Sequence, residues 1–251
     1  MGEATLQTFR LIIEYDGSGF HGWQRQKKDR TVQETIEKAL AIMTREKVTV
    51  IGSGRTDAGV HALGQVACFK TRSRLDARVF LTGLNSLLPG DVVVHACDPM
   101  PDVFHARFDV ASKRYRYHIL NRPIAPAIGR QFVWHIRKQL DTAAMTDAAM
   151  VILGTHDFKA FEGTGSPRDH SIRTVTDSTI KETGDGNLTY DIQANGFLRF
   201  MVRNIVGTLV EVGLGKIDKQ DVRAILQSKD RSRAGATAPP QGLFLMDVTY
   251  Q

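Results

Sequence analysis

The sequence predicts an α+β fold made of two halves that share the order β-α-β-β-α-β, the ferredoxin-like (RRM-like) arrangement. Three observations lead to this prediction. Stretches with apolar residues at every second position alternate with stretches of helical spacing. The same order occurs twice along the chain, with one extra helix in the second half. A segment with two prolines, DPMPDVFHARFD, separates the two halves and predicts domains at 1–105 and 106–251.

The first half opens on a strand. The apolar residues that share one face of residues 8–15 are Phe9, Leu11, Ile13 and Tyr15. Thr31 and Glu34 have the spacing of a capping box and predict the start of an amphipathic helix. The remaining expected elements are strands at 47–53, 65–70 and 92–97 and a helix that Asp76 caps and that ends at Leu87.

The second half begins with KRYRYHI at 113–119, where tyrosines lie on one strand face and arginines on the other. The elements expected after it are a helix from Asp141 to Gly154, strands at 172–182, 187–194 and 243–250, and helices at 199–212 and 218–227. Two such halves, with antiparallel or mixed sheets, are expected to meet at a central basic cleft.

The charge of the chain predicts an acidic partner. The formal net charge is +6 and the isoelectric point is about 9.4. Residues 107–138 hold eight Lys or Arg and a single acid, Asp109, and the basic residues alternate with aromatic ones. This composition favours nucleic acid as the partner.

Several classes of protein do not fit the sequence. It has no run of 18 apolar residues, so a membrane-spanning helix is not expected. Cys68 and Cys97 lie in apolar runs and predict buried, reduced thiols in a cytoplasmic protein. No C-x-x-C or H-E-x-x-H pattern occurs and the histidines are scattered, so no metal site is expected.

The most informative stretch is GSGRTDAGVHALGQVACF at 52–69, which places Asp57 in a glycine turn just before a strand. A carboxylate there can act as a nucleophile or as a general base. A neighbouring cation would keep it ionised, and Arg55 and Arg203 are the two candidates. The loop lacks G-K-[ST] and runs into a strand, so it is not a phosphate-binding loop. From these residues alone, a ligand-binding carboxylate and a purely structural turn are equally supported.

The longer string GRTDAGVHA resembles the signature of the tRNA pseudouridine synthase A family. Further stretches similar to that family are YDGSGFHGWQRQ at 15–26, RYRY at 114–117, MVRNIVGTLVEVG at 201–213 and APPQGLFL at 238–245. The resemblance implies an isomerase that needs no cofactor and converts uridine to pseudouridine on the 3′ side of the anticodon stem-loop of tRNA. It also implies two α/β domains with a cleft between them and a homodimer in the cytoplasm.

The same resemblance implies roles for five residues. Asp57 is the expected nucleophile, and Arg203 is expected to pair with it. Tyr115 is expected to stack on the target base, Arg55 to help extrude that base, and Leu243 to line the pocket. Whether Asp57 attacks the ribose carbon or the pyrimidine ring stays open, because both routes use the same carboxylate.

Two other functions account for part of the sequence. A non-catalytic RNA-binding protein of two ferredoxin-like modules explains the charge and the aromatic residues, but not the Arg-Thr-Asp turn. A glycosidase-like enzyme on small nucleosides explains Asp57, but leaves the basic residues without a role. For Trp23, Gln24 and Arg25 in the first loop, contact with RNA and a tryptophan folded back on the protein are equally supported. The residues Lys229, Arg231 and Arg233 form a basic loop that is expected to face RNA. His61 is expected to be structural.

Overall fold

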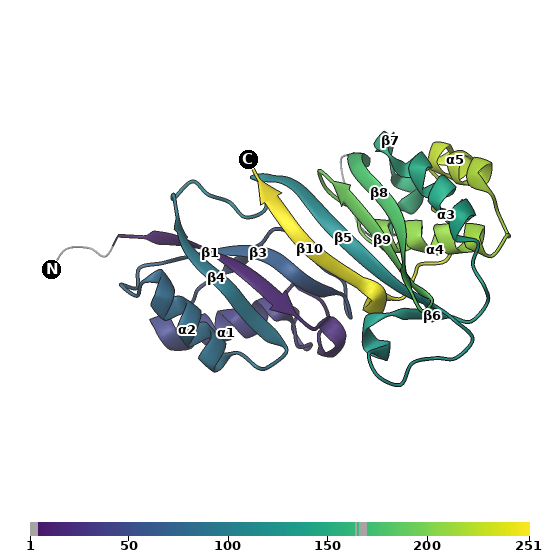
Figure 1. The fold of residues 1–251 in the computed structure, drawn as a ribbon. Coiled ribbons are helices and arrows are strands. Elements are labelled where there is room, and N and C mark those ends of the chain that lie inside the picture. Colours follow the sequence, from purple (N-terminus) through teal and green to yellow (C-terminus); the bar gives the residue numbers. More distant parts are fainter. Residues whose placement is uncertain (1–4, 164, 166–169) are drawn as a thin grey trace. The chain divides into compact units, whose positions relative to one another are not determined.

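The computed structural model describes residues 5–163, 165 and 170–251 (Figure 1). These residues form ten strands and five α-helices, which confirms the α+β class. The chain divides into two compact units, unit 1 with Met1–Ala111 and Leu245–Gln251 and unit 2 with Ser112–Phe244. The C-terminal strand, which the sequence analysis gave to the second half, therefore falls mostly in unit 1. In the described part of the chain, no helix is long and apolar enough to cross a membrane.

Unit 1 has the element order that the sequence predicts. Its elements are β1 (Gln7–Tyr15), α1 (Val32–Thr44), β2 (Val50–Gly52), β3 (His61–Thr71), α2 (Ala77–Leu87) and β4 (Val92–Met100), joined by most of β10 (Leu243–Tyr250). β1 lies between β4 and β3 and pairs antiparallel with both, and β2 pairs antiparallel with β3. Both helices lie on the same face of this sheet (Figure 1).

Three phenylalanine rings form the centre of the core in unit 1. Phe9 and Phe69 face each other across β1 and β3, with ring centroids 5.4 Å apart. Phe80 of α2 lies 4.9 Å from the first ring and 5.2 Å from the second. The predicted apolar face of β1 is buried along its whole length. The alternation in the sequence therefore identifies the face of β1 that packs against the helices.

The two helix starts of unit 1 differ in how their backbone N–H groups are satisfied. The Asp76 carboxylate accepts from the N–H of Val79 at 2.8 Å, as predicted. The predicted capping box at Thr31 is wrong, because the Thr31 side chain makes no cap hydrogen bond. The N–H groups of Val32 and Gln33 instead donate to the carbonyls of Gly22 and Trp23 in the preceding loop. The loop backbone thus replaces the side-chain cap.

Unit 2 is built on the strand order β5-β9-β8-β7, with antiparallel neighbours. Its elements are β5 (Val110–Asn121), β6 (Trp134–Ile136), α3 (Thr142–Ala149), β7 (Gly154–Asp157), β8 (Ile172–Gly184), β9 (Asn187–Ala194), α4 (Met201–Gly213) and α5 (Lys219–Ser228). The expected helices and strands of the second half are present, and β6 and β7 are two further short strands that the sequence did not predict. Strands of three and four residues are too short to show an alternation.

We expect Asp76→Ala to lower the free energy of unfolding by about 1 kcal/mol, because it removes the side-chain cap of α2. Thr31→Val should cause no loss, since the Thr31 hydroxyl is buried and has no hydrogen-bond partner among the described residues. Urea unfolding of both variants beside the wild type measures the difference. Equal destabilisation by the two substitutions would contradict this account of the helix starts.

Candidate active site

The turn that carries Asp57 lies between β2 and β3 and is packed against the loop that follows β1. Gly52 marks the closest approach, because a Cβ there would lie 2.5 Å from Cε2 of Trp23. Trp23 is only 2% exposed, with its ring centroid 6.2 Å from that of Tyr15. Of the two alternatives for Trp23, the structure has the one in which the side chain folds back on the protein.

Backbone hydrogen bonds tie the same loop to the turn. The N–H of Trp23 donates to the carbonyl of Thr56 at 3.1 Å, and the N–H of Gly59 donates to Phe20 at 3.2 Å. Within the turn, Val60 N–H donates to the carbonyl of Asp57 at 3.1 Å. Gly59 has a φ of 77°, a conformation that favours glycine. The backbone on both sides of the half-buried Asp57 is therefore fixed.

A buried polar network supports the turn from the strand side. The hydroxyls of Tyr15 and Thr56 are hydrogen-bonded at 2.7 Å. Gln65 of β3 donates to the carbonyl of Gly54 at 3.2 Å and accepts from the Ser53 hydroxyl at 2.7 Å. Burial raises the pKa of Tyr15 to about 12, so this phenol stays neutral at physiological pH. The network joins two strands to the residues immediately before Asp57.

Arg55 and His61 lie in different surroundings. The sequence predicts a functional role for Arg55 and a structural role for His61. Arg55 is exposed, and its Nε donates to Oε1 of Gln24 at 3.0 Å. His61 is buried, and its Nδ1 accepts from the backbone N–H of Gly17 at 3.0 Å. Asp16 lies 3.2 Å from the same nitrogen, but a backbone N–H can only donate, so Nδ1 acts as an acceptor. His61 holds the loop after β1, which is a structural role.

Tyr115 lies on β5 in unit 2, on the buried face with Tyr117 that the alternation predicts. Its side chain is 8% exposed, and its ring meets Phe197 edge-on with centroids 5.0 Å apart. Tyr117 donates its hydroxyl to the carbonyl of Pro239 at 2.7 Å. Burial raises the pKa of Tyr117 well above its usual value.

Arg203 lies in the first turn of α4 and is tied to the segment that leads to Leu243. Its Nε donates to the carbonyl of Ala238 at 2.8 Å, and the Ala238 N–H donates back to the Arg203 carbonyl at 3.0 Å. Leu243 is buried and begins β10 a few residues later. Within unit 2, segment 238–243 thus links Arg203, Leu243 and the tyrosine face of β5. Within unit 1, Asp57 and Arg55 share one turn.

The chain matches known proteins along most of its length. A sequence model of the family described as tRNA pseudouridine synthase matches residues 11–109 and 148–251. A protein named tRNA pseudouridine synthase A from Thermoanaerobacter sp. (strain X514) is 49% identical over 245 residues, 98% of this chain and 100% of the relative. Its namesake from Acetivibrio thermocellus is 47% identical over 245 residues, with the same coverage. A Clostridium tetani protein named tRNA pseudouridine synthase A 2 is 44% identical over 243 residues, 96% of this chain and 98% of the relative.

The chain belongs to the tRNA pseudouridine synthase family. The family predicted from GRTDAGVHA and the four further stretches is therefore confirmed. Every predicted site residue except Tyr115 lies inside the ranges that the family model matches.

Three residues that support the predicted site residues were not predicted from the sequence. Gln65 is fully buried, and its amide connects Ser53 and Gly54 of the turn to β3. The only signal in the sequence is an amide within the otherwise apolar run before Phe69. Phe197 and Phe200, which pack beside Tyr115 and Arg203, follow β9 in a stretch without a recognisable period.

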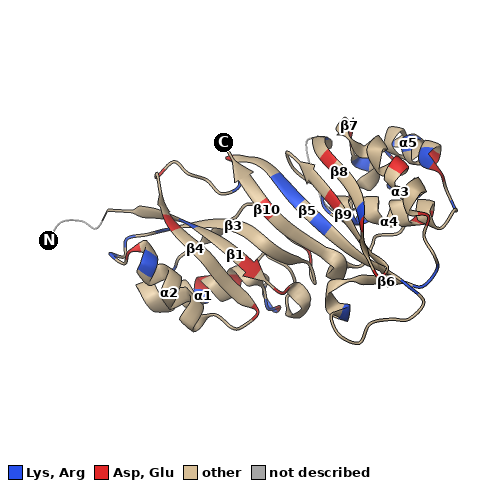
Figure 2. Ribbon diagram, viewed as in Figure 1, with Lys and Arg blue, Asp and Glu red and all other residues tan. Residues whose placement is uncertain are grey.

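Two of the basic residues expected to contact RNA are hydrogen-bonded within the protein. Arg116 of β5 makes two hydrogen bonds, at 2.8 and 3.1 Å, to the Asp191 carboxylate on the neighbouring strand. Arg231 donates to Asn204 and Thr237, and so lies folded on the protein. Arg114 and Arg233 are exposed. Lysine and arginine are present on β5 (Figure 2), but part of that charge is balanced by Asp191.

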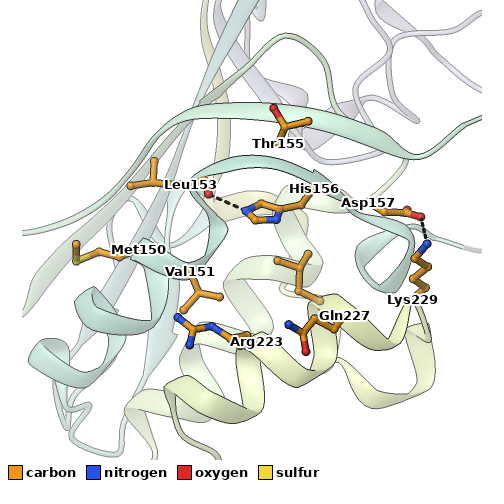
Figure 3. Close-up of a pocket in the computed structure, with 10 residues that line it drawn as sticks. Met150, Val151, Leu153, Thr155, His156, Asp157, Arg223, Gln227 and Lys229 are labelled. Atoms are coloured by element: carbon orange, nitrogen blue, oxygen red, sulfur yellow. Dashed lines mark hydrogen bonds and ion pairs between the residues drawn. The ribbon is translucent and has the colours of Figure 1, made fainter.

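A cavity of about 600 Å³ lies in unit 2 (Figure 3). The residues lining it come from the short 3-10 turn after α3, from β7 and from α5 and the residue that follows it, and none of the five predicted site residues is among them. Lys229 reaches Asp157 at its edge, with nitrogen and oxygen 3.0 Å apart. Although burial acts in the opposite direction, hydrogen bonds from Ser171 and Lys229 lower the pKa of Asp157. In the described chain, no three His, Cys, Asp or Glu side chains are grouped as metal ligands.

We expect the stability of the protein to fall above pH 10, partly through Tyr15. Its pKa is about 12 when folded and about 10 when unfolded, so its contribution is complete below pH 10 and is lost as the pH rises towards 12. At pH 11 the loss from this residue is about 1.4 kcal/mol. Urea unfolding at pH 8 and pH 11 should show a smaller fall for Tyr15→Phe than for the wild type. An identical fall in both proteins would rule out a role for Tyr15 in this pH dependence.

Proposed function

We propose that this protein isomerises uridine to pseudouridine in tRNA with Asp57 as the nucleophile. The observation that carries the proposal is the fixed turn, in which a half-buried carboxylate is held by backbone hydrogen bonds on both sides. Relatives 44–49% identical to the chain are named tRNA pseudouridine synthase A, which supports tRNA as the substrate. A preorganised carboxylate suits attack on an electrophilic carbon.

The reaction needs no co-reactant, because product and substrate are isomers. The bond between N1 of uracil and C1′ of ribose breaks, the base turns, and C5 bonds to C1′. The proton lost from C5 is balanced by the proton gained at N1. The Asp57 carboxylate forms the transient adduct, either with the ribose carbon or with the pyrimidine ring, and is released unchanged.

In this proposal Arg203 keeps the Asp57 carboxylate ionised. An opposite charge close to a carboxyl group favours its ionised form. The hydrogen bond from Nε of Arg203 to the Ala238 carbonyl fixes one edge of the guanidinium.

Tyr115, Leu243 and Arg55 are proposed to extrude and hold the target base. Flipping a nucleotide costs about a few kcal/mol, and the exposed Arg55 guanidinium can occupy the space that the base leaves. Stacking of uracil on the Tyr115 ring contributes on the order of 1–3 kcal/mol. The apolar side chain of Leu243 retains the base while its bond to the ribose is broken.

The finer predictions from the resemblance form part of the same proposal. These are uridines on the 3′ side of the anticodon stem-loop, a homodimer, a cytoplasmic location, and two ferredoxin-like halves around a basic cleft. The strand order β4-β1-β3-β2 of unit 1 supports the ferredoxin-like arrangement for that half.

We expect Asp57→Asn to abolish pseudouridine formation and to leave folding and tRNA binding intact, because an amide is a poor nucleophile. Pseudouridine mapping on tRNA incubated with purified protein and no added cofactor measures the reaction. Asp147→Asn, at an exposed position on α3, is the matched control and should keep full activity. Full turnover by Asp57→Asn would exclude Asp57 as the nucleophile, and binding without conversion by the wild type would favour an RNA-binding module.

We expect Arg55→Ala to reduce turnover of folded tRNA by roughly 10-fold, and to affect a short unpaired RNA much less, because only the folded target must be unstacked. Arg78→Ala, at an exposed position on α2, removes the same charge elsewhere and serves as the control. Equal losses on both RNAs would show that Arg55 acts through binding and not through base extrusion.

A further inference from the structure

Phe200 has an unusual backbone conformation at the start of α4. Its φ is 60° and its ψ is 3°, in the left-handed region, and it occupies the position before Met201, the first residue of the helix. A residue with a bulky side chain is strained in this region, and such strain persists only where the surroundings hold it. Phe200 makes no side-chain cap hydrogen bond, and the contacts of its ring are the side-chain contacts available at this position.

The ring of Phe200 lies directly against the backbone at Gly163. A Cβ at position 163 would lie 2.3 Å from Cδ2 of the ring, so a larger residue there would displace the ring. The N–H of Gly163 donates to the carbonyl of Arg199 at 2.8 Å, which fixes the two segments to each other. The ring position is thus determined by backbone contacts.

Two guanidinium groups lie over this ring. Cζ of Arg199 is 4.7 Å from the ring centroid and Cζ of Arg203 is 5.1 Å from it, both within the range of a cation–π interaction. Arg203 is also bound through Nε to the Ala238 carbonyl at 2.8 Å. The Phe200 ring and the Ala238 carbonyl therefore act on different parts of one guanidinium and restrict its rotation.

We propose that Phe200 is a positioning residue for the isomerisation. Its left-handed backbone places the ring beneath Arg203 and so fixes the direction in which that guanidinium meets an anionic group of the reaction. This inference rests on the proposed function, in which Arg203 pairs with Asp57. Phe200 itself touches no reacting atom in this account.

Three substitutions at position 200 separate the effect of the ring from that of the backbone. Phe200→Tyr keeps the ring and should keep kcat within about twofold of the wild type. Phe200→Leu removes the ring but keeps the strain, and Phe200→Gly removes both. We expect kcat to fall about 10-fold or more in the last two, with KM for tRNA changed less than threefold. Ile42→Ala, at an exposed position on α1, should change neither constant.

The pH profile adds a readout that a merely structural role would not move. The charged and titratable side chains that the structure places around the ring are Arg199 and Arg203 over it, Tyr117 beside Arg203, and the ion pair of Glu162 and Lys159 next to Gly163. A guanidinium that is held less firmly lowers the pKa of a partner carboxyl less. The acid limb of kcat/KM should therefore move to higher pH in Phe200→Leu and Phe200→Gly, and stay in place in Phe200→Tyr.

Gly163→Ala tests the same idea without changing Phe200, because the added methyl displaces the ring. It should reproduce the fall in kcat and the shift of the acid limb, and circular dichroism identifies any variant that fails to fold. An active wild type with unchanged kcat in Phe200→Leu and Gly163→Ala overturns the positioning role alone. A wild type that forms no pseudouridine overturns the proposed function, and this inference falls with it.

Discussion

Close backbone contact between the loop after β1 and the turn at 52–60 is the constraint on which the candidate site in unit 1 depends. The contact is possible because Gly52 leaves room for the Trp23 ring. Hydrogen bonds from Trp23 and Gly59 then join the two segments. The same loop satisfies the first N–H groups of α1 through the carbonyls of Gly22 and Trp23. One set of contacts therefore fixes the carboxylate-bearing turn and starts a helix of the core.

In unit 2, the predicted site residues are held in place by side-chain hydrogen bonds. Segment 238–243 is bound to α4 through Arg203 and to β5 through the hydroxyl of Tyr117. Arg231 donates to Thr237, the residue before this segment, and to Asn204 of α4. The segment has no regular structure beyond one short 3-10 turn, so its position is set by these side chains. The residues proposed to bind the base are consequently held by polar contacts between elements far apart in the sequence.

Some arginines of this protein stabilise its fold, and others are exposed at its surface. The bidentate pair of Arg116 with the buried Asp191, and the contacts of Arg231, stabilise the fold of unit 2. Arg114 and Arg55 are exposed at the surface, where the proposed tRNA substrate can reach them. A high isoelectric point therefore overstates the number of charges that RNA can contact. The salt dependence of tRNA binding should reflect the exposed set alone.

The sequence by itself determined the α+β class, the element order of unit 1, the buried faces of β1 and β5, and the family, because alternation, helix spacing and motif strings are local properties. It also singled out Asp57, Arg55, Tyr115, Arg203 and Leu243, whose roles stay proposals. Only the tertiary structure decided that Trp23 folds back, that a loop replaces the Thr31 cap, and that Arg116 pairs with Asp191. It alone revealed Gln65 and Phe200. These features depend on which distant segments come into contact, and a single sequence carries no local signal for that.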